Sequence, residues 1–206
     1  MYIKKPMEIE NKSMDIIDQV MSDTNFSEEE MIIAKRMIHT TGDFEYRHII
    51  DFRTDFIKTA KKEISKGITI YTDTKMVHAG INKSALEKAN CNLKYFIDDK
   101  RAYSLSKELA TTRSACAIDL AVEDGIEVFV IGNAPTALFR ILELVGEGKA
   151  NPKFIIGVPV GFVGAAESKE YLRQFDIPSI STVGNKGGSN VAASIVNALL
   201  YMVVGR

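Results

Sequence analysis

Short apolar runs recur along residues 67–206 of the chain. The runs are rich in β-branched residues and nearly continuous in apolar positions, which is typical of strands covered on both faces. They predict five strands, at 67–73, 93–98, 127–133, 153–159 and 178–184. Because a strand with one face in water alternates apolar and polar residues, the pattern favours a mainly parallel sheet between two layers of helices.

Helical spacing of apolar residues fills the intervals between these runs. The spacing predicts helices at 82–90, 101–123, 135–147, 165–174 and 189–204. Helices of this length can serve as crossover connections between parallel strands. We therefore expect a three-layer, doubly wound α/β fold with a mainly parallel five-stranded sheet, and fold-level analogy predicts a switch point between its first and fourth strands.

The first 66 residues show no convincing strand pattern. They predict helices near 11–21, 28–39 and 44–65. Ser27, followed by three glutamates, predicts a capping box at the start of the second helix. Since no linker or repeat interrupts the chain, we expect one domain over residues 1–206, with a helical extension (1–66) packed on an α/β core (67–206).

Composition excludes several classes of function. A formal charge of -1 and a pI near 6.3 argue against a nucleic-acid partner, which needs a concentrated basic face. The N-terminal lysines precede no apolar run, so we expect no secretory signal. Residues 191–204 are apolar but contain Asn197 and are too short to cross a bilayer, so we expect a buried or interface helix and no membrane partner. Two cysteines without a CxxC spacing favour a reduced, cytoplasmic setting.

Five loops follow the predicted strands, and ligands of open parallel sheets bind at that edge. Three of the loops are glycine-rich and lead directly into a helix, which suits an anionic ligand. The glycines of 157–164 do not have the GxGxxG spacing, and Lys186 precedes its glycine pair, unlike the lysine of a Walker A loop. A carboxylate or phosphate ligand remains favoured over a nucleotide, and ordinary tight turns remain the alternative.

Two cations could meet such a ligand. Arg113 lies near the start of a predicted helix, where a positive charge opposes the helix dipole, so an anionic partner would explain its position. Lys186 lies between polar and glycine residues in a bare loop. Both positions are also compatible with solvated surface side chains.

The chain has three histidines, of which His39 is the strongest candidate for chemistry. His48 fits a solvated side chain, and His78 follows the first predicted strand and fits either interpretation. Arg36 and His39 lie on one helical stripe with Ile32, and imidazole exchanges protons near neutral pH. Spacing alone fits a helix-capping histidine equally well.

Six strings of residues carry a resemblance to a known family. They are RMIHTTGD (36–43), DTKMVHAGI (73–81), TRSACAI (112–118), GNAPTALFRILEL (132–144), IIGVPVGFVGAAESKE (155–170) and KGGSNVAA (186–193). With these strings in this order, over almost its whole length, the chain resembles the precorrin-8X methylmutases, including those that act on cobalt-precorrin-8.

The resemblance implies an isomerase of corrin biosynthesis that moves a methyl group from C-11 to C-12 of the precursor, giving hydrogenobyrinic or cobyrinic acid. It implies a tetrapyrrole substrate, a homodimer and no external cofactor or protein metal site, since any cobalt belongs to the substrate. The family's catalytic histidine corresponds to His39, which would act as general acid or base. The expected substrate-binding residues are Ser13, Arg36, Thr40, Thr41, Arg113, Asn133, Thr136, Lys186, Gly187, Gly188 and Ser189.

Two features of the sequence bear on the choice of substrate. The polar pair Thr40 and Thr41, and Lys186 in the last glycine loop, differ from the residues associated with the aerobic enzymes. Both differences favour the cobalt-containing precursor without deciding the choice. A non-catalytic corrinoid carrier with the same cleft remains the alternative function, and a nucleotide- or phosphate-dependent enzyme is disfavoured by the glycine spacing.

Overall fold

The computed structural model describes residues 4–205, which form six strands and eleven helices. The strands are β1 (Ile50–Arg53), β2 (Thr69–Thr72), β3 (Asn92–Lys94), β4 (Val128–Ile131), β5 (Phe154–Gly157) and β6 (Ser179–Thr182). The helices are α1 (Pro6–Met21), α2 (Glu28–Thr41), α3 (Tyr46–Ile49), α4 (Phe56–Ile64), α5 (Lys75–Gly80), α6 (Lys83–Lys88), α7 (Lys100–Glu108), α8 (Arg113–Glu123), α9 (Pro135–Gly146), α10 (Ala165–Leu172) and α11 (Ser189–Val204).

The strands form one sheet in the order β1-β6-β5-β4-β2-β3. Strands β2 to β6 are parallel, as predicted, and β1 pairs antiparallel with β6 at the edge. The expected strand count of five is therefore too low by one. The expected switch point is also wrong, because the first predicted strand, β2, pairs with the third, β4, and not with the fourth.

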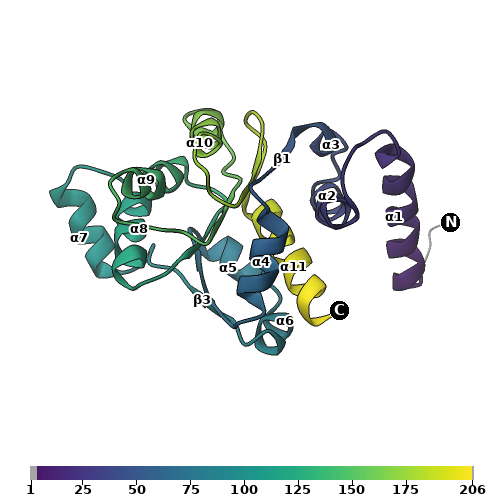
Figure 1. Ribbon diagram of the computed structural model, residues 1–206, viewed down its shortest axis with the longest axis horizontal. Helices are drawn as coiled ribbons and strands as arrows, with labels where there is room; N and C mark the ends of the chain where they lie inside the picture. Colours follow the sequence, from purple (N-terminus) through teal and green to yellow (C-terminus); the bar gives the residue numbers. More distant parts are fainter. Residues whose placement is uncertain (1–3, 206) are drawn as a thin grey trace.

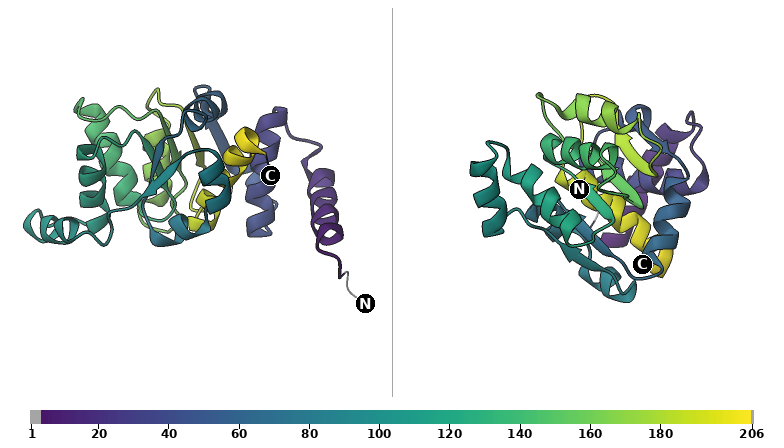
Figure 2. Two further views of the ribbon diagram at one scale, coloured as in Figure 1. Left: turned by 90° about the horizontal axis from the view of Figure 1, so that it is seen from below. Right: turned by 60° about the vertical axis from the view of Figure 1, so that its left-hand side comes forward.

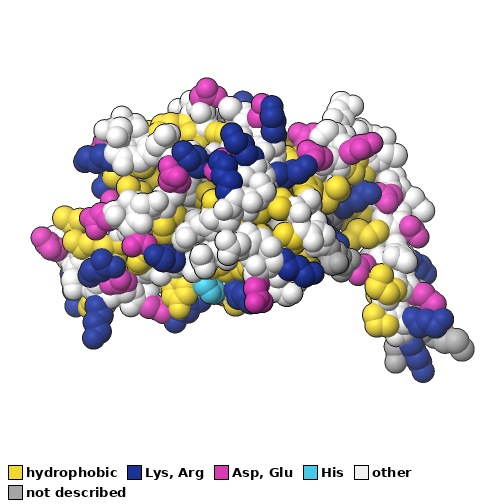
Figure 3. All heavy atoms as spheres, turned by 60° about the horizontal axis from the view of Figure 1, so that its bottom comes forward, with side chains coloured by type: hydrophobic (Ala, Val, Ile, Leu, Met, Phe, Trp, Pro, Cys, Tyr) yellow, Lys and Arg dark blue, Asp and Glu magenta, His cyan; other side chains and the backbone are white. Residues whose placement is uncertain are grey.

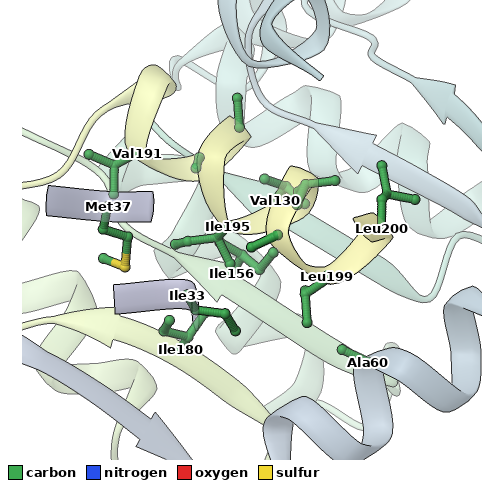
Figure 4. Packing of buried hydrophobic residues seen from close by; sticks show 14 of the residues in the cluster. Ile33, Met37, Ala60, Val130, Ile156, Ile180, Val191, Ile195, Leu199 and Leu200 are labelled. Carbon is green, nitrogen blue, oxygen red and sulfur yellow. The ribbon is translucent and has the colours of Figure 1, made fainter. Parts of the chain in front are cut away.

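Helices cover both faces of the sheet (Figure 1). Helices α7 to α10 lie on one face, over a core that includes Phe129 and Ile155, and α2, α4, α5, α6 and α11 lie on the other. On this second face, Ile33 of α2 and Ile195 of α11 converge toward Ile156 of the sheet (Figure 4). The α2 helix thus belongs to the same apolar core as the parallel strands.

Two predicted helices are each divided. The predicted helix at 44–65 consists of α3, β1 and α4, and the break after β1 contains Thr54 and Asp55 with φ of 48° and 52°. The predicted helix at 101–123 consists of α7 and α8, with Ala110 at φ 49° between them and the Thr112 side chain capping α8. Neither break contains a glycine or a proline. A left-handed backbone at any other residue is uncommon, so the sequence gives no signal that the helix is interrupted at these places.

The C-terminal helix α11 has the bounds that its apolar pattern predicts. Its interior Asn197 is satisfied by neighbouring backbone, since its Nδ2 donates to the Gly80 carbonyl and its Oδ1 accepts from the Asn82 N–H. Within residues 4–205 no helix is both long and apolar enough to span a membrane. Helix α1 projects beyond the sheet at one end of the molecule (Figure 2).

Candidate active site

His39 lies in the last turn of α2, on the face turned away from the core. The helix begins with the predicted capping box of Ser27 and Glu30 and runs to Thr41, two residues further than expected. Gly42 ends it in a left-handed conformation, and its N–H donates to the Ile38 carbonyl at 2.8 Å. Among residues 4–205 no hydrogen bond or ion pair involves the His39 side chain, which is exposed. Gly42 therefore caps the helix, and the imidazole is free for another role.

Arg36 and Ser13 both lie where α1 meets α2. The guanidinium of Arg36 is half-buried and pairs with the Glu10 carboxylate of α1 at 3.3 Å. The hydroxyl of Ser13 donates to the Ile9 carbonyl within α1. Arg36 is thus already paired with a carboxylate one helical turn before His39, which reduces the positive charge that the sequence alone suggests there.

The turn between β6 and α11 lies beside the C-terminal end of α2. Asn190 Nδ2 donates to the Thr40 carbonyl at 3.5 Å, and the Tyr46 hydroxyl donates to the Gly187 carbonyl at 3.4 Å. The Gly188 N–H donates to the Val158 carbonyl at 2.9 Å. A Cβ at Gly187 would collide with the same carbonyl oxygen, so this position requires glycine because of close backbone contact.

Lys186 connects this turn to the segment that follows His39. Its ammonium pairs with Asp43, and with Glu45 at 2.6 Å. Hydrogen bonds to these carboxylates raise the pKa of Lys186 and lower the pKa of Asp43. Lys186 is therefore a structural cation in this conformation as well as a candidate for substrate binding.

The turn between β4 and α9 is held from below by a buried carboxylate. Asp73, at the end of β2, accepts the N–H groups of Gly132, Asn133 and Ala134 at 3.0, 2.8 and 2.8 Å. Burial raises the pKa of Asp73, and these three bonds act against that shift. The three N–H groups consequently point inward, although the glycine-rich sequence suggested that they would face an anion. The exposed Asn133 side chain can still reach a ligand.

Ser189 contacts the loop after β2, since its hydroxyl oxygen lies 3.2 Å from that of Thr74, the residue after Asp73. The structure thus joins the loops after β2, β4 and β6 to the C-terminal end of α2. Most of the expected residues lie in this group, namely His39, Thr40, Thr41, Asn133, Lys186, Gly187, Gly188 and Ser189.

Arg113 and Thr136 lie on the opposite face of the sheet from α2, at the starts of α8 and α9 (Figure 1). Thr112 donates to Thr136 at 2.8 Å, which joins these two helix ends. In the described part of the chain, Arg113 is exposed and its side chain has no hydrogen bond or ion pair. Thr136 lines a hollow of about 440 Å³ between α8 and α9. Within residues 4–205 of a single chain, neither residue has a hydrogen bond or ion pair that connects it to His39.

The other histidines take no part in this group. His48 is exposed and its Nε2 accepts from Arg47 at 2.9 Å. His78 belongs to α5, packs edge-on against Tyr95 and lines a hollow of about 390 Å³ near Cys91. Burial lowers the pKa of His78. Across residues 4–205 no three His, Cys, Asp or Glu side chains form a metal-binding group.

Sequence reasoning missed two buried charges at this edge. Asp73 directly follows an apolar strand, and Lys169 occupies the buried phase of α10 with Ala165, Ser168 and Leu172. A charged residue in an apolar phase is the signal that identifies both. On the face in Figure 3, Lys and Arg side chains are interspersed with Asp and Glu, and no basic region dominates.

Known proteins are similar to this chain in sequence and in fold. The sequence model of the family Precorrin-8X methylmutase matches residues 8–202. The cobalt-precorrin-8 methylmutase of Salmonella typhimurium is 42% identical over 97% of each chain. That of Methanocaldococcus jannaschii is 41% identical over 96% of this chain and 94% of the relative. A precorrin-8X methylmutase structure from Thermus thermophilus superposes with a TM-score of 0.89 at 33% identity, over 96% of both chains. The chain therefore belongs to the precorrin-8X methylmutase family, whose members are isomerases of corrin biosynthesis.

Proposed function

We propose that this chain converts cobalt-precorrin-8 to cobyrinic acid by moving the methyl group from C-11 to C-12, with His39 as general acid. The observation that carries the proposal is the exposed His39 on a capped helix end, directly beside the glycine turn of residues 186–188. The imidazole has no partner in residues 4–205 and is available to a ligand at this edge.

The reaction needs little from the protein besides binding and one proton. The bond from the methyl group to C-11 breaks as the bond to C-12 forms, and the product keeps every atom of the substrate. No external cofactor, oxidant or methyl donor is therefore required, and any cobalt is carried by the substrate. In this proposal His39 donates a proton to a ring nitrogen, which stabilises the charge that develops during migration, and takes a proton back once the methyl group has moved, a contribution of about 10²- to 10⁴-fold in rate.

The surroundings of His39 suit a macrocycle fringed with carboxylates. The first turn of α11 begins at Ser189 without a side-chain cap, so its N–H groups can receive an anion. The hydroxyls of Thr40 and Ser189 and the side chain of Asn133 add donors around the same edge. We propose that Ser13, Arg36, Thr41, Lys186 and the exposed Arg113 complete substrate binding, with Thr136 beside Arg113.

A homodimer is part of the proposal. Helix α1 projects from the molecule and exposes Met7, Ile9 and Ile16, whose exposed fractions are 63%, 46% and 47%. A second copy of the chain could cover this apolar surface. It could also bring its Arg113 toward the His39 of the first copy. Light scattering coupled to size exclusion should then give twice the chain mass of 22.8 kDa.

The choice of cobalt-precorrin-8 is supported by Thr40, Thr41 and Lys186 and by the names of the two relatives, whereas the solved structure is named for precorrin-8X. The test mixes purified protein with cobalt-precorrin-8 and metal-free precorrin-8X in parallel and follows the absorption spectra. We expect a change with the cobalt compound in a single turnover. A change only with precorrin-8X would overturn the substrate, and binding without any change would indicate a corrinoid carrier.

A further inference from the structure

Lys169 of α10 is a fully buried cation without a carboxylate partner. Its Nζ donates to the Thr182 hydroxyl at 3.0 Å and to the Lys186 carbonyl at 2.7 Å, and both acceptors are neutral. Across the described residues Lys169 makes no ion pair. Burial, with the nearby charge of Arg173, lowers the pKa of Lys169 to about 8. A buried charge of this kind is costly, so packing of α10 alone does not explain a lysine here.

The two bonds of Lys169 fix the start of the glycine turn. The Lys186 carbonyl also accepts from the Thr182 hydroxyl at 2.6 Å, so two donors hold it inward. Directly after the neighbouring strand β5, the Val158 carbonyl accepts the Gly188 N–H. The backbone of residues 186–188 is thus attached to α10, β6 and the end of β5.

Fixing this carbonyl determines which groups of the turn remain available. With the Lys186 carbonyl turned into the protein, the N–H groups of Gly187 and Ser189 have no hydrogen-bond acceptor among residues 4–205. Both N–H groups lie at the entrance to α11, where the helix dipole favours an anion. The Lys186 side chain meanwhile extends to Asp43 and Glu45, just after the helix that carries His39.

We propose that Lys169 is a positioning residue that orients the turn of residues 186–188 for a carboxylate of the substrate. The inference rests on the proposed function, since the carboxylate is that of a corrin precursor. Lys169 itself touches no substrate and acts through the backbone of Lys186. Its loss should leave the chemistry at His39 intact and weaken ligand binding by loosening the turn.

The test compares the wild type with Lys169→Met, which keeps an unbranched side chain of similar length and removes the ammonium. At pH 7, hydrogen exchange at the Gly188 amide, which donates to the Val158 carbonyl, should accelerate by about 10-fold or more, because the hydrogen bonds from a charged donor that hold the turn are lost. Exchange at Gly132 to Ala134, held by Asp73, should be unchanged. Binding of cobyrinic acid should weaken by about 10-fold, with KM raised and kcat little changed.

Two further variants make the result decisive. Thr182→Val removes the other donor to the Lys186 carbonyl and should accelerate exchange at the Gly188 amide, so it supplies the readout if Lys169→Met does not fold. Lys62→Met removes an exposed lysine of α4 and should match the wild type in exchange and KM.

Wild-type exchange at the Gly188 amide in either folded variant, together with an unchanged KM, would overturn the positioning role. The exchange comparison uses the protein without ligand, so it judges Lys169 even if the wild type neither binds nor isomerises a corrinoid. Failure of the wild type in those assays would instead refute the proposed function.

Discussion

The turns that follow β4 and β6 are each held by a buried charge, and the two charges have opposite sign. On the buried side of residues 132–134, the Asp73 carboxylate accepts three backbone N–H groups. On the buried side of residues 186–188, the Lys169 ammonium donates to the backbone carbonyl of Lys186. An anion below a turn draws its N–H groups inward, whereas a cation draws a carbonyl inward and leaves N–H groups facing out. Only the second turn can therefore offer those backbone donors to an anionic substrate.

The first turn should lose the most stability when its charge is removed. Asp73→Asn keeps the shape but replaces one acceptor oxygen with an NH₂ group that faces backbone donors. We expect the free energy of unfolding to fall by about 4 kcal/mol, because at least one of the three bonds is lost and those that remain no longer have a charged acceptor.

Urea denaturation measures this change, with Asp98→Asn as the control. Asp98 is half-exposed and pairs with Lys75 on the surface, so its loss should cost at most about 1 kcal/mol. Equal effects of the two substitutions would show that Asp73 does not hold its turn.

The second turn should respond to pH through Lys169. Its pKa is about 8 in the folded chain and 10.5 in an exposed lysine, so between these values the unfolded chain holds more protons. Stability from this group therefore rises with pH across that window, by roughly 3 kcal/mol in all. Tyr46, with its pKa raised to about 12 by burial, affects wild type and variant alike.

Urea denaturation of the wild type and Lys169→Met at several values between pH 7.5 and 10.5 isolates this effect as a difference. The wild type should gain stability relative to the variant as pH rises. Parallel pH curves would mean that Lys169 does not carry a buried charge.

Replacing Gly187 by any residue with a side chain should be unfavourable. In Gly187→Ala the new methyl group collides with the Val158 carbonyl, so we expect a loss of about 2 kcal/mol in stability and weaker product binding. Gly146→Ala, in the last turn of α9 with open space around it, is the matched control and should gain up to about 1 kcal/mol. Calorimetry of both variants distinguishes close backbone contact from a general sensitivity to alanine.

The sequence predicts elements well where one local pattern decides the structure. Helix α11 has its expected bounds because a long apolar run starts and ends at glycines. Strand β1 was missed because its four residues, IDFR, lie in a charged stretch and become a strand through pairing with β6. The break at Thr54 and Asp55 has no glycine or proline to announce it.

The site follows the same rule: local sequence patterns predict some of its features, and contacts between distant residues are missed. The exposure of His39 follows from its helical phase, and the capping box fixes that helix. The pairing of Arg36 with Glu10, and the pairing of Lys186 with Asp43, join residues far apart in sequence and depend on the packed fold. Asp73 and Lys169 lie in apolar phases, where a pattern of hydrophobic positions treats a charge as an interruption.

The most direct test of the central claim is single-turnover isomerisation of cobalt-precorrin-8 by His39→Ala, with His48→Ala as the control because both histidines are exposed. We predict a rate lowered by about 10²- to 10⁴-fold in His39→Ala, with product binding retained, and no change in His48→Ala. A near-normal rate in His39→Ala would contradict the assignment of His39 as the catalytic acid.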